Sequence, residues 1–219
     1  FLNEVKKLNP KLPPFAIALI NSCKGGKRIR GALVKLGYEI AGGSHLGGEI
    51  LKVGAAYEIF HASILIHDDI IDQSELRRGN LTLYRALGGD HYGISQALLL
   101  ADVGFFLSTK IMADVKLPDA FKNQALSHFA RTVINTGWGE ILDMELPHLS
   151  GQGTGYSGQE EDVIAIHKLK TAQYTVAGPL ITGAILAGAE EEMINKLSEF
   201  LENNPNMKIY DSIIASMNL

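Results

Sequence analysis

The chain has 219 residues, of which 46% are apolar and 20% are charged, and its formal net charge is −4 at pH 7. This composition is typical of a soluble globular protein long enough to bury a core, and the slightly acidic balance argues against a broad basic surface for nucleic acid. The single Cys23 excludes an internal disulfide and suits a reducing compartment, so we expect a cytoplasmic protein.

Apolar residues recur at helical spacing along most of the chain. The long patterns cover roughly residues 28–41, 46–72, 93–114 and 118–135. The uncharged stretch Ala172–Ala189 is barely long enough for a membrane span. Its proline and polar residues favour a buried helix with a proline kink instead. No segment shows convincing strand periodicity. The sequence predicts an all-α fold, a single domain (1–219) of antiparallel helices around a central cavity, with no membrane span.

The first chemically distinctive segment is Lys24-Gly25-Gly26-Lys27-Arg28-Ile29-Arg30, which places four cations around two glycines. Glycine lets backbone N–H groups approach a ligand closely, and a helix that begins there would present its positive end to an anion. Lys27 and Arg30 would share a face of that helix. Such a cluster is usually a solvated loop or a nucleic-acid patch. The negative net charge weakens the second interpretation, and the pattern favours one compact anion.

Three carboxylates, Asp68, Asp69 and Asp72, interrupt a strongly apolar helical run. Burying bare carboxylates is costly unless something neutralises them. Asp68 and Asp72 are four residues apart and therefore share a helix face. Such a cluster suits Mg²⁺, which takes one or two carboxylates together with waters and substrate phosphates. A solvated helix end is the simpler interpretation of three clustered acids, but the apolar flank argues against it.

The segment Arg77-Arg78-Gly79 follows five residues after Asp72 and supplies two fixed cations for phosphate oxygens. Far downstream, Lys170 and Tyr174 lie four residues apart in a helical pattern and share a face. Taken alone, this lysine would be interpreted as an ordinary surface side chain.

In this order, the motifs resemble the trans-isoprenyl diphosphate synthases of the polyprenyl synthetase family, geranylgeranyl and polyprenyl diphosphate synthases among them. The match consists of Gly25–Arg30, His61, Asp68–Asp72, Arg77–Gly79 and Lys170–Ala172. The aspartate motif alone is moderately specific, whereas the ordered set is highly specific. The resemblance implies a Mg²⁺-dependent prenyltransferase of isoprenoid biosynthesis, normally a homodimer of all-α chains. Such an enzyme condenses isopentenyl diphosphate with an allylic diphosphate into a longer trans-prenyl diphosphate.

The resemblance also implies a role for each matching residue. Asp68 and Asp72, supported by Asp69, would hold Mg²⁺ on the allylic diphosphate, and stabilisation of that leaving group is the main catalytic effect expected. Asp68, Asp72, Lys170 and Thr171 would be the catalytic residues. The residues implied to bind isopentenyl diphosphate are Lys27, Arg30, His61 and Arg78. Arg77 and Lys170 would bind the allylic diphosphate. Thr171 and Tyr174 would lie near the developing carbocation. His61 could also be a core histidine, but it lies seven residues before Asp68 on the same helix face, which favours the site.

Product length would depend on the helix face below Asp68. Phe60, Ile64 and Asp68 are spaced i, i+4 and i+8, so they stack on one side of the helix. Ser63 is small where short-chain members of the family often carry an aromatic residue. An open upper cavity above Phe60 predicts a product longer than farnesyl, geranylgeranyl first and a longer polyprenyl second. Phe60 could also be an ordinary core residue facing a neighbouring helix.

The chain departs from the family pattern near its end. A second aspartate-rich motif normally follows a Phe-Gln pair, but after Phe200 the chain continues at Leu201 with only Asp211 still to come. One explanation is that the sequence omits residues between Phe200 and Leu201, in which case we expect a break or a poorly ordered loop there. The other is a non-catalytic subunit that binds diphosphate. The intact first motif favours an enzyme.

Two further functions are weaker alternatives. A metal-dependent terpene cyclase shares the aspartate motif, but it has no second diphosphate substrate to match the Gly-Gly-Lys-Arg cluster. A helical nucleic-acid-binding module is disfavoured by the net charge and by the acids in an apolar run.

Overall fold

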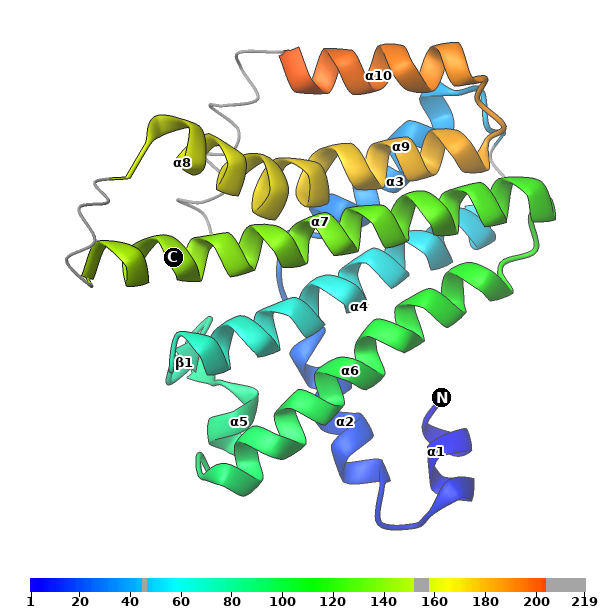
Figure 1. Ribbon diagram of the computed structural model, residues 1–219. Coiled ribbons are helices and arrows are strands. Elements are labelled where there is room, and N and C mark those ends of the chain that lie inside the picture. The colour runs from blue at the N-terminus through cyan, green and yellow to red at the C-terminus, as the bar shows by residue number, and fades with distance from the viewer. Residues whose placement is uncertain (45–46, 152–157, 204–219) are drawn as a thin grey trace. The chain divides into compact units, whose positions relative to one another are not determined.

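The structure is a computed structural model in which residues 1–44, 47–151 and 158–203 are described, and most of them are helical (Figure 1). The elements in chain order are α1 (Leu2–Leu8), α2 (Pro13–Ser22), α3 (Ile29–Ile40), α4 (Gly47–Ile71), β1 (Leu76–Arg77), β2 (Asn80–Leu81), α5 (Leu83–Ala86), α6 (His91–Asp114), α7 (Asp119–Gly151), α8 (Glu160–Ile166), the π-helix η1 (His167–Ala177), α9 (Gly178–Leu186) and α10 (Glu191–Asn203).

The described residues form two compact units. Unit 1 comprises Phe1–Arg28 and Ala55–Asp114, and unit 2 comprises Ile29–Gly54 and the described part of Val115–Leu219. The long helix α4 therefore contributes its first residues to unit 2 and the rest to unit 1. The expectation of a single domain stays a prediction.

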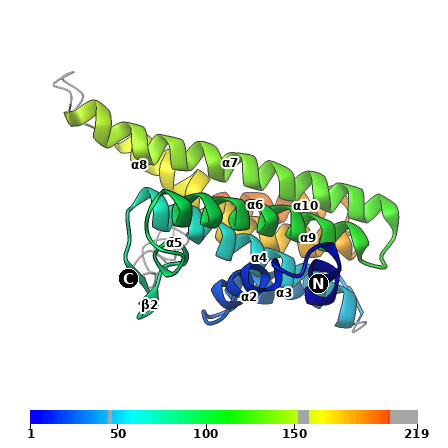
Figure 2. The same ribbon diagram turned by 90° about the horizontal axis from the view of Figure 1, so that it is seen from below.

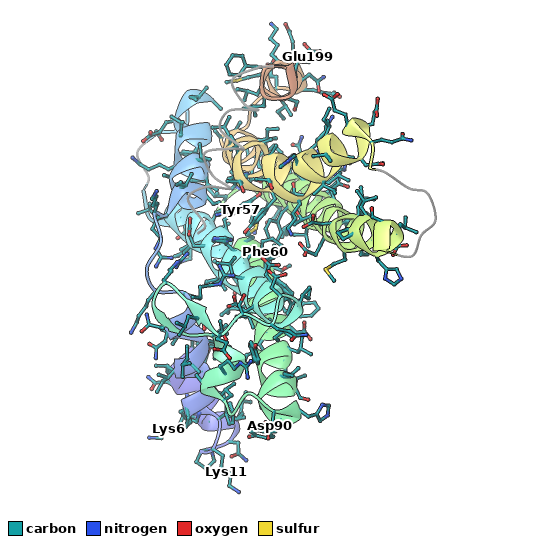
Figure 3. All side chains as sticks on the ribbon, turned by 90° about the vertical axis from the view of Figure 1, so that its left-hand side faces the viewer. Lys6, Lys11, Tyr57, Phe60, Asp90 and Glu199 are labelled. Atoms are coloured by element: carbon teal, nitrogen blue, oxygen red, sulfur yellow. The ribbon has the colours of Figure 1, made fainter. Side chains whose placement is uncertain are left out.

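Unit 1 is built around α6, against which α2 and α5 both pack (Figure 2). Its core is a cluster of buried apolar side chains from four helices: Leu19, Ile66, Tyr84, Ala97, Leu100 and Ala101. α4 and α6 approach closely, because a Cβ atom added at Gly104 would lie 2.0 Å from Ser63 Oγ. Tyr57 and Phe60 also lie in the buried core along α4 (Figure 3).

Unit 2 depends on backbone-to-backbone contact between α3 and α9. A Cβ added at Gly37 would lie 1.9 Å from Leu180 O, and one added at Gly183 would lie 2.0 Å from Val34 O. Every residue of α9 is buried. The segment from η1 into α9 packs along α7, and α10 covers α9 (Figure 1). Glycine at these positions lets the two helices pack without a gap.

The helices expected from apolar periodicity are confirmed, with three corrections. α7 runs on to Gly151 instead of ending near residue 135. Pro179 lies in the first turn of α9, directly after the π-helix η1, and not inside one continuous α-helix; the first turn of an α-helix needs no N–H group from proline. The hairpin of β1 and β2 was missed, since strands of two residues are too short to show a period.

The expected break or loop at Phe200–Leu201 is wrong. The peptide joining these residues lies inside α10, and Leu201 is buried. Met193, Leu197 and Leu201 recur at four-residue spacing, so the apolar stripe of the helix passes through this point without interruption. Asp211 lies outside the described residues.

Two helices are long and apolar enough to cross a membrane by length and composition alone, Gly48–Ile71 and His91–Asp114. This is weak evidence for a membrane protein, because core helices of globular proteins pass the same test. More than half of the apolar window in the first helix is buried inside the protein.

Candidate active site

The three predicted metal-binding acids lie at the C-terminal end of α4 in unequal surroundings. Asp69 is 4% exposed, Asp68 is half-buried, and Asp72 is exposed just beyond the helix end. Burial raises the pKa of Asp69 and the nearby Asp72 adds to this, while Arg77 opposes it. The apolar run therefore withdraws only one of the three carboxylates from water.

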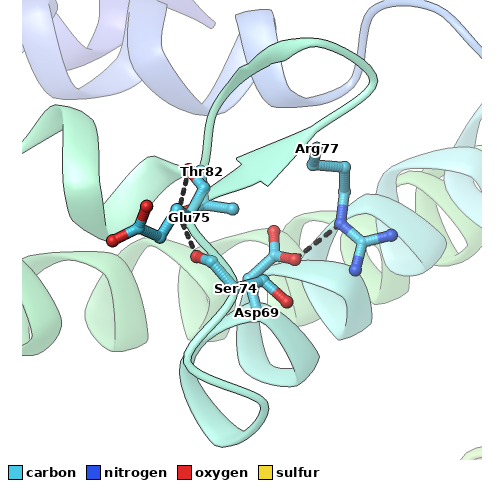
Figure 4. Close-up of polar contacts among 5 residues, drawn as sticks. All are labelled: Asp69, Ser74, Glu75, Arg77 and Thr82. Atoms are coloured by element: carbon cyan, nitrogen blue, oxygen red, sulfur yellow. Dashed lines mark hydrogen bonds and ion pairs between the residues drawn. The ribbon is translucent and has the colours of Figure 1, made fainter.

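A tight turn places Arg77 beside Asp69. α4 ends at Ile71, and Gln73, with a φ of 53°, turns the chain back; Arg78 (φ 53°) and Gly79 (φ 78°) then form the two-residue turn between β1 and β2. Two consecutive positive φ angles are the requirement of a type I′ hairpin turn. Arg77 Nε then donates a hydrogen bond of 2.6 Å to Asp69 Oδ1 (Figure 4).

Hydrogen bonds at the base of the hairpin hold it in place. The Thr82 hydroxyl donates to Ser74 O at 2.9 Å, and a longer contact of 3.4 Å reaches Glu75 O (Figure 4). Thr82 is 2% exposed. This buried anchor fixes the hairpin that carries both arginines.

The second arginine of the hairpin, Arg78, reaches the glycine loop instead of the acids. Its Nη1 donates to Lys24 O at 3.2 Å, and a Cβ added at Gly26 would lie 3.1 Å from its Nη2. Gly25 and Gly26 adopt φ angles of 78° and 81°, which favour glycine. Arg78 and the glycine loop are therefore neighbours within unit 1.

Two other predicted residues of unit 1 have less distinctive surroundings. Lys27 is exposed at the end of the glycine loop, and His61 is half-buried on α4. Arg28, next to Lys27, has a φ of 57° and donates from Nη2 to Cys23 O at 2.6 Å, which fixes the loop to the end of α2.

Unit 2 holds the remaining predicted residues on α3 and η1. Arg30 is 7% exposed, and its Nη2 donates a hydrogen bond of 2.8 Å to Thr175 Oγ1. Its guanidinium lies over the Tyr174 ring, 4.3 Å from the centroid. Arg30 is therefore withdrawn from solvent, which the sequence pattern did not indicate.

Lys170 has two carboxylate partners that sequence reasoning missed. Its Nζ lies 2.6 Å from Asp143 Oδ2 and 2.9 Å from Glu140 Oε2, both on α7. Burial works to lower the pKa of Lys170, but hydrogen bonds and charges from the two acids outweigh it, and the pKa is raised. Glu140 and Asp143 are three residues apart and therefore share a helix face. This pattern would have been visible if the predicted helix had extended past residue 135. Thr171 beside Lys170 is half-buried.

A family model for polyprenyl synthetase matches residues 15–204. The chain belongs to the polyprenyl synthetase family. It is 30% identical over 198 residues to a geranylgeranyl diphosphate synthase of Sulfolobus acidocaldarius, covering 89% of this chain and 54% of that protein. It is 31% identical over 176 residues to a geranylfarnesyl diphosphate synthase of Methanosarcina mazei, covering 80% and 52%. The chain thus spans about half the length of the curated relatives it matches.

Solved structures of polyprenyl synthetases share the fold. One is a geranylgeranyl pyrophosphate synthase from Corynebacterium glutamicum, described as complexed with isoprenyl diphosphate and magnesium. It superposes with a TM-score of 0.80 at 26% identity and covers 90% of this chain and 58% of that one. The all-α fold predicted from the sequence is confirmed.

The acids at the end of α4 fit a metal ion only in part. Over residues 1–44, 47–151 and 158–203, no group of three or more His, Cys, Asp or Glu side chains is placed to hold a metal ion by itself. Mg²⁺ usually keeps several waters and takes one or two carboxylates together with substrate phosphates. Asp68 and Asp72 could supply these one or two carboxylates. Asp69, between them in the sequence, is instead paired with Arg77.

The residues expected to set product length have mixed surroundings. Phe60 is 2% exposed, and its ring lies 5.3 Å from that of Phe105 on α6. Ser63 is fully buried against Gly104, and Ile64 is half-buried. Phe60 therefore packs against a neighbouring helix, as the simpler interpretation expected, and a role in product length stays a prediction.

Proposed function

We propose that the protein carrying this chain is a Mg²⁺-dependent trans-prenyltransferase. It joins isopentenyl diphosphate to an allylic diphosphate and makes a longer prenyl diphosphate. The observation that carries this proposal is the division of the hairpin arginines. Arg77 binds the acid cluster, whereas the adjacent Arg78 binds the glycine loop. Two anion-binding regions on one hairpin suit a reaction with two diphosphate substrates, and a terpene cyclase requires only one.

The side chains of the chain would act in two groups. Lys27, Arg30, His61 and Arg78 would hold isopentenyl diphosphate so that its double bond can attack. Arg77 and Lys170 would bind the diphosphate that leaves the allylic substrate. Preorganised positive charge is most effective where negative charge develops, here on the departing oxygens. When bound at Asp68 and Asp72, Mg²⁺ would supply further positive charge to the same group.

After the diphosphate leaves, the chain must tolerate a carbocation without quenching it. Thr171 and Tyr174 on η1 offer a hydroxyl and an aromatic ring close in sequence to Lys170. An aromatic face attracts a cation electrostatically. The reaction ends with attack by isopentenyl diphosphate and loss of a proton.

Geranylgeranyl diphosphate is our first choice for the product, and a longer polyprenyl diphosphate is the second. The small Ser63 near the acid cluster supports this, as do the relatives named as geranylgeranyl and geranylfarnesyl diphosphate synthases. Chain-length analysis of products from Phe60→Ala tests the role of Phe60. An unchanged distribution from a folded variant would place the cavity floor elsewhere.

A homodimer is the assembly we propose, and apolar stripes on two long helices support it. On α6, Leu99, Val103 and Phe106 are 59%, 46% and 77% exposed. On α7, Ile134 and Trp138 are 59% and 61% exposed. Apolar stripes of this size are costly in water unless a partner covers them. Light scattering should show a dimer that Phe106→Glu or Trp138→Glu dissociates. A monomeric parent protein would refute this assembly.

The single Cys23 supports a reducing compartment such as the cytoplasm.

The function is tested by turnover. Purified protein is incubated with labelled isopentenyl diphosphate, farnesyl diphosphate and Mg²⁺, and the products are separated by chain length. The second candidate function is a non-catalytic subunit that binds diphosphate. Binding of isopentenyl diphosphate without any product would support that candidate and refute the enzyme.

A further inference from the structure

Arg30 has an unusual set of partners for a buried cation. Its Nη2 bonds the Thr175 hydroxyl at 2.8 Å and its guanidinium covers the Tyr174 ring, but its Nε is buried without a hydrogen-bond acceptor. Within the described part of the chain, no carboxylate forms an ion pair with Arg30. A buried charge without a counter-charge is costly, and a hydroxyl and a ring compensate it only in part. Among residues 1–44, 47–151 and 158–203, the Arg30 side chain thus has no anionic partner.

Thr175 is well suited to hold such a group still. It is 2% exposed, and its branched Cβ restricts the side chain to few rotamers. Its oxygen engages one end of the guanidinium while the Tyr174 ring restricts the plane. These two contacts remove most of the rotational freedom that a long arginine side chain would otherwise lose when an anion binds.

We propose that Thr175 is a positioning residue for isopentenyl diphosphate. Its hydroxyl holds the Arg30 guanidinium in the orientation that receives the diphosphate oxygens, an inference that rests on the function proposed above. Thr175 itself does not touch the substrate. The hydrogen bond also ties α3 to η1, the helix that carries Lys170 five residues earlier.

The test compares two buried threonines of unit 2. Thr175→Val removes the hydroxyl and keeps the shape. Thr136→Val is the matched control, because Thr136 is 5% exposed and its hydroxyl donates to Thr132 O on its own helix. Calorimetric titration with isopentenyl diphosphate should show binding weakened by about tenfold in Thr175→Val, the loss expected for a bond to a charged group. Thr136→Val should bind as the parent does.

Two further variants separate positioning from general damage. Thr175→Ser retains the hydroxyl and should restore most of the affinity. In an Arg30→Lys background, Thr175→Val should weaken binding by less than about twofold, because the partner through which Thr175 acts is already gone. In turnover, the KM for isopentenyl diphosphate should rise about tenfold while the KM for farnesyl diphosphate changes less than threefold.

Each outcome separates this inference from the proposed function. A parent protein that does not bind isopentenyl diphosphate overturns both. A parent that binds, with Thr175→Val and Thr136→Val equally affected, overturns the positioning role and leaves the function standing. An undiminished effect of Thr175→Val in the Arg30→Lys background also overturns it. If Thr175→Val does not fold, Thr175→Ser and Thr175→Ala carry the comparison, and equal binding by these two overturns the role.

Discussion

The end of α4 with its hairpin and the π-helix η1 both hold charged side chains away from water, but they compensate those charges differently. In the first region, the buried Asp69 is matched by Arg77 within hydrogen-bond distance. In the second region, Arg30 has a hydroxyl and a ring, and Lys170 has two carboxylates. In the first region each buried charge has one partner. In the second region, among the described residues, Arg30 has no acid partner and Lys170 has two.

This difference distinguishes charged side chains that stabilise the fold from charged side chains that can bind a ligand. A charge that is matched inside the protein contributes to the fold, so removal of its partner leaves a buried charge that destabilises the protein. A buried charge that is not matched is costly to the fold and is available for a ligand. The following predictions test that division, from the largest expected effect to the smallest.

The largest effect is expected for Asp68→Ala, which should lower turnover by at least about 100-fold, because a bound metal contributes several kcal/mol of charge stabilisation. The folded state should lose little stability, since Asp68 lies partly in solvent. Asp114→Ala, an exposed acid paired on its own helix with Lys110, is the control. Near-normal rates from Asp68→Ala in steady-state assays would contradict the metal role.

The next prediction separates the two anion regions by substrate. Lys27→Ala should raise the KM for isopentenyl diphosphate more than the KM for the allylic substrate, and Arg77→Ala should do the reverse. Each variant loses a charge-assisted contact of about 1.5–3 kcal/mol, or roughly 10- to 100-fold. Steady-state kinetics with each substrate varied in turn supply the measurement. Equal changes in both KM values from either variant would mean that the regions are wrongly assigned.

A third prediction compares two acids of the same cluster. Asp69→Ala should lower the free energy of unfolding by about 1–3 kcal/mol, because Arg77 loses its counter-charge in a partly buried site. Asp72→Ala, at an exposed position, should change it by less than about 0.5 kcal/mol. Urea titration measures both. Indistinguishable unfolding midpoints for the two variants would show that the pair of Asp69 and Arg77 does not stabilise the fold.

The smallest effect concerns His128 on α7. Its Nε2 is buried without a partner, and burial, aided by Arg131, lowers its pKa from 6.5 to about 4. The unfolded chain binds a proton below pH 6.5, but the folded chain does so only near pH 4. Stability from this group is therefore present at neutral pH and lost as the pH falls through that window.

The expected loss is on the order of 1–2 kcal/mol between pH 7 and pH 5. His128→Gln should flatten this part of the pH profile of unfolding free energy. A variant with the same pH slope as the parent would show that other groups control it.

The long helices and the charged motifs could be predicted from the sequence, and each for a physical reason. Long helices bury one face over many turns, so α3, α4 and α6 were recognisable from period alone. The motif positions Asp68–Asp72 and Arg77–Gly79 were recognisable because their chemistry is uncommon in apolar surroundings. The positive φ angles of Arg78 and Gly79 could not be predicted, because they depend on the pairing of the two short strands on either side of the turn.

Contacts between segments distant in sequence were not predictable from spacing. Arg30 and Thr175 are 145 residues apart, and nothing in either local pattern shows that they meet. Glu140 and Asp143 were missed because the expected helix stopped near residue 135. Phe60 shows the same limit, since helical spacing gives the side of α4 on which it lies but not that Phe105 covers it.

Because η1 is a π-helix, the number of residues between Lys170 and Thr175 determines how far apart these side chains point around the helix. In an α-helix, two residues five apart point about 140° away from each other, whereas the wider turn of a helix with i→i+5 bonds brings the same two residues closer to one side. Lys170 and Thr175 therefore lie closer together around η1 than they would around an α-helix. Substitutions that rewind η1 into an α-helix at full length should turn them apart. Deletion of Ala172 should be tolerated better, since four residues of an α-helix leave the two only about 40° apart.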